Sequence, residues 1–555
     1  MIVDSLLSAQ KLITPLWDFC IIGSGFAGMA LAWELTAKNS NYRIALIESG
    51  EYRPRAEIQG LSDLANHPAN HAPMRLAVNR RIGGASGVWG GRCVPYDEYD
   101  FLKRDYVPDA EWPISYAELF QYLDRACAFL KCGRGDFTVA SGLRQISEYW
   151  RDGDVLASTI ERWSLPLDLR REFYHDLRLS RSIFLFSGLT CVNLSYDLEA
   201  GTVRHAVLSR IDGEKLSIRA RRFIIAAGGL ESARLLLYSN RKNEYTAGDF
   251  GRALGRFYQG HISGKIANVV FSGDARQTIY QFEKDQDGVY FRRRLTFPAR
   301  VLSQHRLLNF AAWLDNPPIF SPEHGNGVLS AAYLALLTPG IGAKLASPAI
   351  RTAILDNASH HPALAGHLRN VSFNLPATLA FCLRFVFQRY CQARKLPGFF
   401  APGRNNVYAL HYHAEQAPSW QSFARLSAET DRLGVNRLEV HLRYSDQDMD
   451  SVVRGHGLLD HWLRGNGIGR LAYHAKDLPA QVARQAADGF HQIGVTRMAA
   501  DRNRGVVDAD CKVFGLSNLY MCGSGVFPTS GQANPTLTIV CLALRLADHL
   551  HANNV

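Results

Sequence analysis

The chain has 555 residues, of which 47% are hydrophobic and 20% charged, and its formal net charge is +11. This length exceeds one compact core and predicts at least two domains, and the composition excludes a disordered or low-complexity protein. The positive charge is spread thinly, since the densest basic run is the three residues from Arg292 to Arg294. We therefore expect no nucleic-acid partner.

The ten cysteines are scattered, without paired CxxC zinc spacing or CxxCH haem spacing, and the N-terminal sequence lacks the pattern of a secretory signal. These features favour reduced thiols in a cytoplasmic protein. Two apolar stretches, 327–344 and 375–391, are interrupted by Pro339 and by Arg384, so neither offers the ~20 apolar residues of a membrane span. We expect a helical insertion near 320–400 and no integral membrane segment, with interfacial membrane contact as the alternative.

A dinucleotide-binding signature lies near the N-terminus. A buried-strand pattern at 19–22 precedes Gly23, Gly25 and Gly28 in G-x-G-x-x-G spacing, then a helical pattern and a strand that ends at Glu48. The first glycine permits the tight turn, the second lets the backbone approach a pyrophosphate, and the third lets the helix pack on the strand. Glu48 is placed to accept hydrogen bonds from ribose hydroxyl groups. This unit alone leaves NAD and FAD open, because both present the same ADP moiety.

Two further segments add glycine-rich turns. RIGGASGVWGGRC, from Arg81, places five glycines around Ser86 and Trp89, a density that suits backbone lying against a flat ligand ring. RRFIIAAGG, from Arg221, predicts a strand, a Gly-Gly turn and a helix, and a strand-like segment around Val192 precedes it.

Together with HQIGVTRM from His491 and GSGVFPTSGQANPTLT from Gly523, these segments resemble the glucose-methanol-choline (GMC) family of FAD-dependent oxidoreductases. GGASGVWGGRCVP, followed by WPISYAEL, resembles particularly the bacterial members that act on sugars and polyols. The motifs extend over roughly the first 130 residues, 190–265 and 405 to the end, and none falls between about 300 and 400.

The resemblance implies an α/β fold, α+β overall, in which a Rossmann-type FAD-binding domain is interleaved with an antiparallel-sheet substrate domain. The FAD-binding domain is expected in residues 1–130, 190–265 and 475–555. The substrate domain is expected in 131–189 and 266–474.

The resemblance also implies how the cofactor is held. The histidine that attaches FAD covalently in some members falls at Val88, which has no nucleophile, so we expect non-covalent FAD. Two positions depart from the family pattern: Val495 replaces the usual threonine, and Gly525 stands where serine is frequent. The residues expected to contact the cofactor are Gly23, Gly25, Gly28, Glu48, Gly84, Ser86, Trp89, Gly90, Val192, Ala227, Gly228, Gly523, Ser524, Asn534, Pro535 and Thr536.

Oxidation of an alcohol removes a proton from oxygen and a hydride from carbon, and a flavin accepts the hydride. The protein must supply a base, and by family position that base is His491, with Asn534 donating to the developing alkoxide. Asn534 also precedes Pro535 and an apolar helical pattern, so it is alternatively the N-cap of a helix.

His411, His413 and Glu415 alternate on a predicted strand and would share one face. Strand neighbours on one face lie ~6–7 Å apart, which is wide for joint coordination, so we expect no metal there. His261 is expected to be structural.

The sequence thus predicts an FAD-dependent oxidoreductase that oxidises the CH–OH group of a sugar, polyol or glycoside. A dehydrogenase subunit that hands electrons to a separate redox protein, and a non-catalytic flavin-binding protein, remain as alternatives. Substrate identity, oxygen reactivity and oligomeric state stay open.

Overall fold

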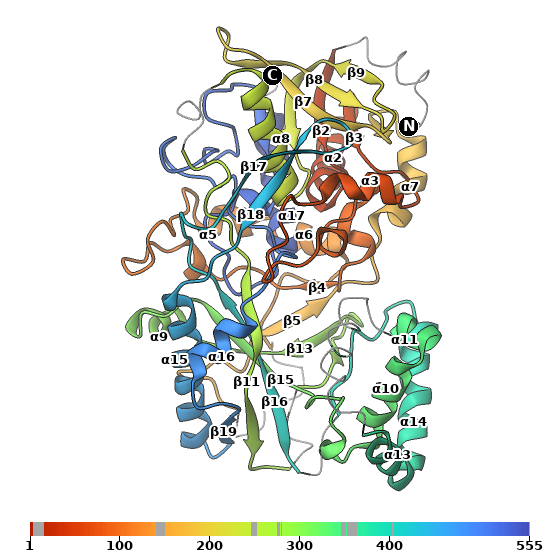
Figure 1. Ribbon diagram of the computed structural model, residues 1–555, viewed down its shortest axis with the longest axis vertical. Coiled ribbons are helices and arrows are strands. Elements are labelled where there is room, and N and C mark those ends of the chain that lie inside the picture. Colours follow the sequence, from red (N-terminus) through yellow and green to blue (C-terminus); the bar gives the residue numbers. More distant parts are fainter. Residues whose placement is uncertain are drawn as a thin grey trace.

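The computed structural model describes residues 1–3, 16–139, 150–245, 252–274, 278, 280–345, 351, 354, 363–401 and 405–553. Two lobes lie one above the other in Figure 1, and each is built around its own sheet. We name them the parallel-sheet lobe and the antiparallel-sheet lobe. The chain passes between them several times, so each lobe is assembled from separated segments.

The parallel-sheet lobe contains a six-stranded, wholly parallel sheet. Its strands, in spatial order, are β1 (Ile2–Val3), β6 (Ile183–Ser187), β3 (Ile44–Glu48), β2 (Trp17–Ile22), β10 (Ala220–Ile225) and β20 (Leu519–Met521). All five residues of β3 are buried, as expected of a parallel strand covered on both faces. The α/β class and the Rossmann-type sheet predicted from the sequence are confirmed.

Strand β6 pairs in register with β3, from Ile44 opposite Ile183 to Glu48 opposite Ser187. Residues 183–187 therefore lie in the parallel-sheet lobe, although 131–189 were expected in the other domain. The reason is the continuous apolar run of IFLF, which is suited to a strand covered on both faces and carries no motif.

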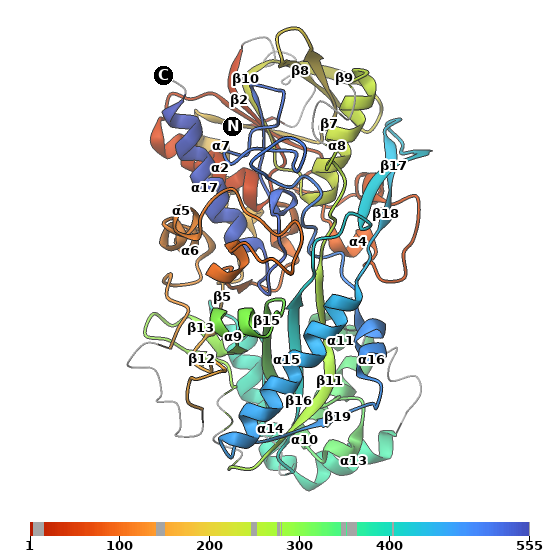
Figure 2. The same cartoon turned by 90° about the vertical axis from the view of Figure 1, so that its left-hand side faces the viewer.

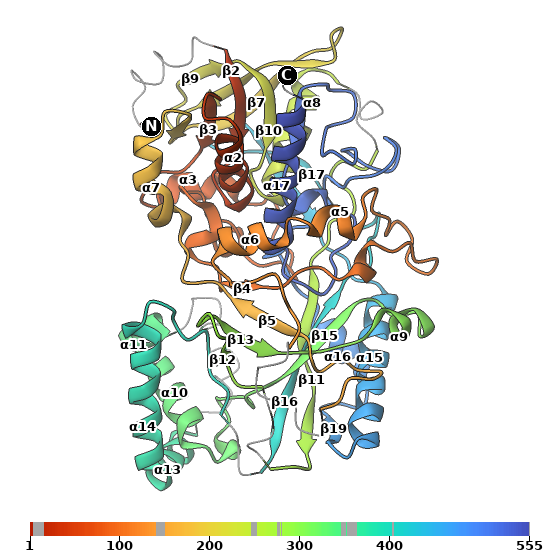
Figure 3. The same cartoon turned by 180° about the vertical axis from the view of Figure 1, so that it is seen from behind.

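Helices and a smaller sheet surround the parallel sheet. Helices α2 (Phe26–Lys38) and α17 (Thr536–Ala552) lie side by side in front of it in Figure 3. Helix α8 (Gly229–Lys242) packs against β7 (Thr190–Asp197), which forms an antiparallel sheet with β8 (Thr202–Ser209) and β9 (Lys215–Ile218).

The antiparallel-sheet lobe contains a five-stranded sheet, in which the longest strand starts at the junction of the lobes and its antiparallel neighbour ends there (Figure 1). Its strands, in spatial order, are β14 (Leu295–Thr296), β15 (Phe310–Asp315), β16 (Val407–Glu415), β11 (His261–Phe271) and β19 (Gly469–Tyr473). Helices α15 (Asp446–Gly465) and α16 (Leu478–Gln485) pack against this sheet. A second sheet consists of β12 (Glu283–Lys284), β13 (Tyr290–Arg293), β5 (Ile160–Trp163) and β4 (Arg92–Cys93).

The hairpin of β17 (Phe423–Thr430) and β18 (Asn436–His441) follows the antiparallel sheet in sequence but packs elsewhere. Its buried Leu438 and Val440 contact Leu230 and Ala233 of α8. The hairpin thus extends the parallel-sheet lobe, as Figure 2 shows at its right-hand edge.

A group of helices projects from the antiparallel-sheet lobe at the lower right of Figure 1. We call α10 (Gly327–Leu337), α11 (Pro339–Leu345), α13 (Leu364–Phe373), α14 (Leu375–Val386) and the π-helical turn η6 (Phe387–Cys391) the helical insertion. In the described part of the chain, no single helix is long and apolar enough to cross a membrane. Two pairs within the insertion pass that test only together, and they are bent by 115° and 93°.

The remaining elements are short. They are α3 (Ala56–Gln59), α4 (Met74–Ala77), α5 (Tyr116–Phe120), α6 (Leu123–Leu130), α7 (Leu169–Leu179), α9 (Ala299–Gln304), η1 (Gly60–Ser62), η2 (Gly84–Gly87), η3 (Glu98–Phe101), η5 (Pro322–His324) and η7 (Ser524–Val526).

Candidate functional site

The first glycine turn joins β2 to α2 and tolerates no side chain at two of its glycines. Gly23 has φ of +110°, and a Cβ there would lie 2.4 Å from the carbonyl oxygen of Ala226. A Cβ at Gly28 would lie 1.9 Å from the carbonyl oxygen of Gly23. A Cβ at Gly25 would meet nothing within 4 Å. The outer two glycines therefore serve packing within the protein, whereas the middle one faces open space.

The other glycine turns gather around the first. A Cβ at Gly84 would lie 3.1 Å from Gly25 Cα, and a Cβ at Gly525 would lie 3.4 Å from Gly229 Cα. Positions where an added Cβ would meet nothing within 4 Å occur in every one of these turns: Gly25, Gly90, Gly228 and Gly523. Four segments far apart in the sequence thus bring glycine backbone together and leave room for a ligand beside it.

Glu48 ends β3 and is buried beside the first turn. Its carboxylate accepts hydrogen bonds from the backbone N–H of Ser24 (3.1 Å), the Ser24 hydroxyl (2.7 Å) and the backbone N–H of Gly50 (2.9 Å). Burial raises the pKa of Glu48, and these hydrogen bonds oppose that effect. The carboxylate therefore orders the turn, and its contact with a ribose remains a prediction.

Two predicted cofactor residues in the second glycine segment make internal hydrogen bonds. The Ser86 hydroxyl donates to the Gly83 carbonyl (2.7 Å) and accepts from the Leu169 N–H (3.0 Å). The Trp89 indole N–H donates to the Leu167 carbonyl (2.9 Å). These side chains hold the segment in shape and leave its backbone as the surface offered to a ligand. Val88, next to Trp89, is 58% exposed.

Three other residues predicted to contact the cofactor lie at a β-bulge or in hydrogen-bonded turns. The register of β7 and β8 shifts between Cys191 and Asn193, which places Val192 at a β-bulge. The Ala227 N–H donates to the Ser232 hydroxyl (3.1 Å). The Ser524 hydroxyl donates to the Gln492 carbonyl (2.7 Å), which ties the turn before η7 to the histidine segment.

The two departures from the family pattern are adjacent in space. A Cβ at Gly525 would lie 2.7 Å from Thr496 Oγ1, the hydroxyl one residue beyond Val495. A serine at 525 would therefore collide with Thr496, and the glycine relieves that contact. Glycine at 525 and threonine at 496 are therefore sterically compatible with each other.

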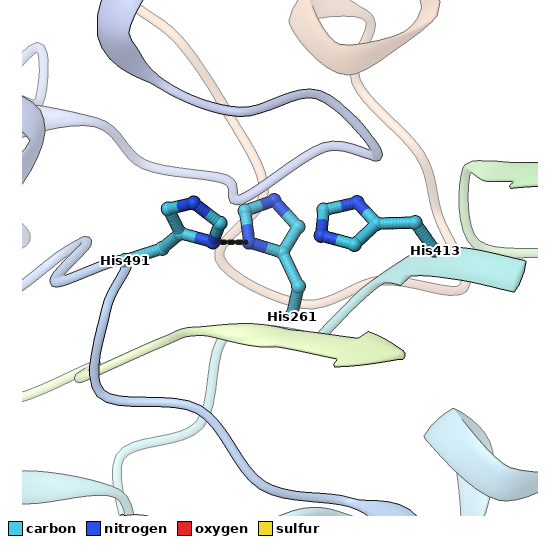
Figure 4. A group of neighbouring side chains, drawn as sticks. All are labelled: His261, His413 and His491. Atoms are coloured by element: carbon cyan, nitrogen blue, oxygen red, sulfur yellow. Dashed lines mark hydrogen bonds between the residues drawn. The ribbon is translucent and has the colours of Figure 1, made fainter. Parts of the chain in front are cut away.

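Three histidines meet at the junction of the lobes (Figure 4). His261 begins β11, His413 lies near the end of β16, and His491 follows α16. The rings of His261 and His413 stack with centroids 4.3 Å apart, and His491 stands edge-on to His261. His261 and His413 are buried, and His491 is partly exposed. Burial lowers the pKa of both inner histidines, so they are neutral at physiological pH.

Hydrogen bonds assign the protons of this cluster. His261 Nε2 lies 3.1 Å from the Ser530 carbonyl oxygen, which can only accept, so this nitrogen carries the hydrogen. His261 Nδ1 then offers a lone pair to His491 Nδ1, 3.0 Å away. His491 consequently holds its hydrogen on Nδ1, and the Nε2 lone pair of neutral His491 points away from His261.

Asp488 lies behind both histidines and is buried. One carboxylate oxygen accepts from the His491 backbone N–H (3.1 Å), and the other lies 3.3 Å from His491 Nδ1 and accepts from the His261 backbone N–H (2.8 Å). Burial opposes ionisation of Asp488, but the positive charge that His491 carries when protonated and the hydrogen bonds from His261 and His491 outweigh it and hold the pKa well below its usual range. Asp488 is therefore ionised and can stabilise a positive charge on His491.

Asn534 completes the cluster. Its side-chain amide nitrogen donates to His491 Nε2 at 2.9 Å. Its amide oxygen is buried and has no hydrogen-bond partner among the described residues. Helix α17 begins at Thr536 without a side-chain capping bond. The predicted N-cap role of Asn534 is therefore wrong, because the side chain turns toward His491.

Sequence reasoning missed three members of this cluster. His261 was expected to be structural, His413 was considered only as a metal ligand on its strand, and Asp488 was not considered. The signal for Asp488 was present, since an acid three residues before a histidine can share a turn with it. His261 and His413 carry no local signal, because strand pairing brings them together.

The spacing of the three histidines also bears on metal binding. Ligand atoms of His261, His413 and His491 lie within 4.8 Å of one another, close enough to hold an ion, although His261 and His491 are hydrogen-bonded to each other. The three alternating residues of β16 each bond a different partner: His411 bonds Ser263, His413 bonds the Gln532 carbonyl and Glu415 bonds Arg104.

The chain matches two family models and several known proteins along its sequence. Residues 418–543 match the family model described as GMC oxidoreductase, and residues 21–53 match an NAD(P)-binding Rossmann-like domain. The chain is 32% identical to a C-glycoside 3-oxidase of Microbacterium trichothecenolyticum, over 96% of each chain. A 6'''-hydroxyparomomycin C oxidase of Streptomyces lividus is 29% identical over 24% of each chain.

Solved structures share the fold at low sequence identity. A pyridoxine 4-oxidase from Mesorbium loti superposes with a TM-score of 0.53 at 15% identity, covering 97% of this chain and 99% of that one. A fungal aryl-alcohol oxidase gives a TM-score of 0.51 at 15% identity over 97% and 99% of the chains.

Proposed function

Because the chain belongs to the GMC family of oxidoreductases, we propose that it oxidises the CH–OH group of a sugar or glycoside with non-covalently bound FAD. The enzyme class and a flavin cofactor follow from the family. The sugar is suggested by the relative named C-glycoside 3-oxidase and by the oxidase named for hydroxyparomomycin. The site residues and the mode of FAD binding are our proposals.

The glycine turns fit the cofactor. Room beside Gly25, Gly228 and Gly523 suits a ligand that lies against backbone, and α2 begins at Phe26 with its N-terminus toward that room. A side chain at any of these positions would fill the space. Val88 offers no atom that could form a covalent bond to the cofactor, which supports non-covalent binding.

His491 Nε2 accepts the substrate proton. Its lone pair is defined by the hydrogen-bond chain from Ser530 through His261, which keeps the hydrogen of His491 on Nδ1. When Nε2 gains a proton, the resulting positive charge is met by ionised Asp488, 3.3 Å from Nδ1. A base held in this way contributes ~10² to 10⁴ in rate. A bound flavin supplies the acceptor for the hydride.

Asn534 orients the substrate hydroxyl. The Asn534 amide nitrogen donates to His491 Nε2 in this structure, and once Nε2 takes up the substrate proton the amide N–H groups can donate to the alkoxide instead. The buried, unpartnered amide oxygen can accept from a substrate hydroxyl. The single observation that carries the proposal is this His491–Asn534 pair, because it places a proton acceptor and an amide donor at one point.

The test is an anaerobic absorbance scan of the purified protein before and after addition of glycosides, sugars, polyols and simple alcohols. We expect flavin bands that bleach with a sugar or glycoside and stay oxidised with simple alcohols. Release of all flavin from acid-precipitated protein would support non-covalent binding. Readmitted air then distinguishes an oxidase from a dehydrogenase that requires a separate electron-acceptor protein. A flavin that no carbohydrate reduces would contradict the proposed substrate class.

A further inference from the structure

The helical insertion carries an unusual share of the exposed apolar side chains. Large hydrophobic side chains stand exposed at 21 described positions, and 11 of them lie between Leu337 and Tyr390. The 11 are Leu337, Ile341, Leu364, Leu368, Phe373, Leu375, Leu379, Leu383, Val386, Phe387 and Tyr390. Scattered single residues of this kind are ordinary, but a concentration on one structural unit marks an interaction surface.

Helix α14 shows that this exposure has a direction. Leu375, Leu379, Leu383 and Val386 recur every three or four residues and so form one stripe along the helix. Leu383 is 73% exposed, and Phe373, at the end of α13, is 80% exposed. The opposite side of α14 lines a cavity of about 450 Å³, through residues that include Ala377, Ala380 and Phe381. The stripe therefore faces away from the protein body.

Charge around the stripe has one dominant sign. Residues 327–395 include seven lysine or arginine residues and a single aspartate, so this segment carries more than half of the net charge of the chain. Lys344, Arg369 and Lys395 are exposed, whereas Arg384 lines the cavity on the opposite side of α14. An exposed apolar helix face in a segment of net positive charge is the pattern of a helix that lies in the interface of an anionic membrane.

We infer that the helical insertion docks on the surface of a bilayer that contains anionic phospholipid. The insertion lies on the membrane and does not cross it, because its helices are short and sharply bent. A second copy of the chain is the less favourable occupant, since a symmetric contact would bring two equally basic surfaces together. Lipid headgroups of negative charge meet the same surface with complementary charge.

The experiment is flotation of the full-length flavin-loaded protein with vesicles. One set contains phosphatidylcholine and phosphatidylglycerol, and the other contains phosphatidylcholine alone. We expect the protein to float with the mixed vesicles at least ~10-fold more than with the neutral ones, and added salt should weaken binding.

The variants separate the apolar and the basic contributions. Leu379→Ser with Leu383→Ser should abolish flotation, because both side chains are exposed and their loss leaves the protein interior intact. Arg369→Glu with Lys344→Glu should remove the preference for anionic vesicles. Leu179→Ser on α7, where the leucine is 68% exposed, is the matched control and should float as the parent does.

Three results would overturn the inference. They are absence of flotation with mixed vesicles, unchanged flotation of the double serine variant, and a dimer in solution that this variant converts to a monomer. Circular dichroism and flavin absorbance confirm that each variant is folded and loaded. The dimer result would assign the surface to a second copy of the chain.

Discussion

The histidine cluster and the helical insertion distribute polarity in opposite ways. At the junction of the lobes, His261, His413 and Asp488 are buried, Asn534 is partly buried, and each of these polar side chains is held by a specific partner. In the insertion, leucine and phenylalanine side chains stand outside and contact no partner that covers them among the described residues. Buried polar groups require specific hydrogen-bond partners, whereas exposed apolar groups require only a surface that covers them. The histidine cluster therefore indicates which chemistry the protein performs, and the helical insertion indicates what the protein binds.

The largest effect is expected at His491. His491→Ala should slow flavin reduction by substrate at least ~10²-fold, because it removes the nitrogen that we propose as the base and to which Asn534 donates. Rapid mixing under anaerobic conditions measures that rate. His367→Ala in the helical insertion is the control, since His367 is a buried histidine far from the cluster in sequence, and it bonds Ser330 and the Phe320 carbonyl. Equal reduction rates in the two variants would remove the base assignment.

The next largest effect is expected at Gly25. Gly25→Ala adds a methyl group where the protein places nothing within 4 Å, and the residue already has φ of −71°, so the fold should be retained. We expect flavin affinity to fall ~10-fold or more, because the methyl group occupies the room left for the cofactor. Fluorescence titration of the apoprotein with FAD measures this. Gly340→Ala, at a similarly open position in the insertion, should bind FAD like the parent.

A smaller effect is expected at His261, which we assign as a positioning residue. His261→Ala removes the acceptor of the His491 Nδ1–H, so the rate of flavin reduction should fall by ~10-fold while the substrate KM stays near its original value. His261→Asn, which can still offer an acceptor, should recover part of the rate. Loss of rate through a raised KM alone would instead indicate a role in substrate binding. Leu379→Ser with Leu383→Ser in the insertion should leave this rate unchanged.

The smallest effect is expected at His456, on how the free energy of unfolding depends on pH. His456 of α15 is fully buried, and burial lowers its pKa from 6.5 to about 4. Between these two values the unfolded chain takes up a proton that the folded protein does not, so the free energy of unfolding falls as pH is lowered and flattens near pH 4. The slope is at most ~1.4 kcal/mol per pH unit for one such group. In thermal unfolding from pH 8 to 4, His456→Gln should show a shallower decline.

The exposed His175 provides the comparison for that experiment, because His175→Gln should leave the pH dependence of unfolding unchanged. His324, at the edge of the insertion, is only partly buried, and we expect a smaller change from His324→Gln. A decline as steep in His456→Gln as in the parent would show that this histidine already carries its proton in the folded state.

The parts of the structure that could be predicted from the sequence are those with a local cause. Gly28 has such a cause, because an added Cβ would strike the carbonyl oxygen of Gly23 in the same turn, whereas the Cβ clash at Gly23 is with Ala226 and appears only in the folded chain. His491 and Asn534 were identified through family resemblance, and their role remains to be tested. The partners of His491 could not be read from the sequence, since β11 pairing with β16 and the turn after α16 bring them together only in the folded chain.

The helical insertion shows the other limit of sequence reasoning. Its helices were expected from two interrupted apolar stretches, but an apolar stretch does not show which face of a helix lies outside. Interfacial membrane contact was considered only as an alternative, and it became the favoured interpretation once the exposed stripe on α14 was seen beside the one-sided charge. The hairpin at 423–441 falls within the range 266–474 expected for the substrate domain, yet its buried Leu438 and Val440 cluster with Leu230 and Ala233 of α8. The apolar pattern of a strand does not show which lobe covers it.

The chain crosses between the lobes at Gln259 and again at Ile493, and these two residues exchange backbone hydrogen bonds of 2.9 and 3.1 Å. His261 and His491 each lie two residues from this paired crossing. This backbone pairing ties the start of β11 to the segment after α16, so the spacing between the two rings is set by main-chain bonds and not by the side chains alone. Substitutions on the surface of either lobe should therefore leave the hydrogen bond between His261 and His491 in place.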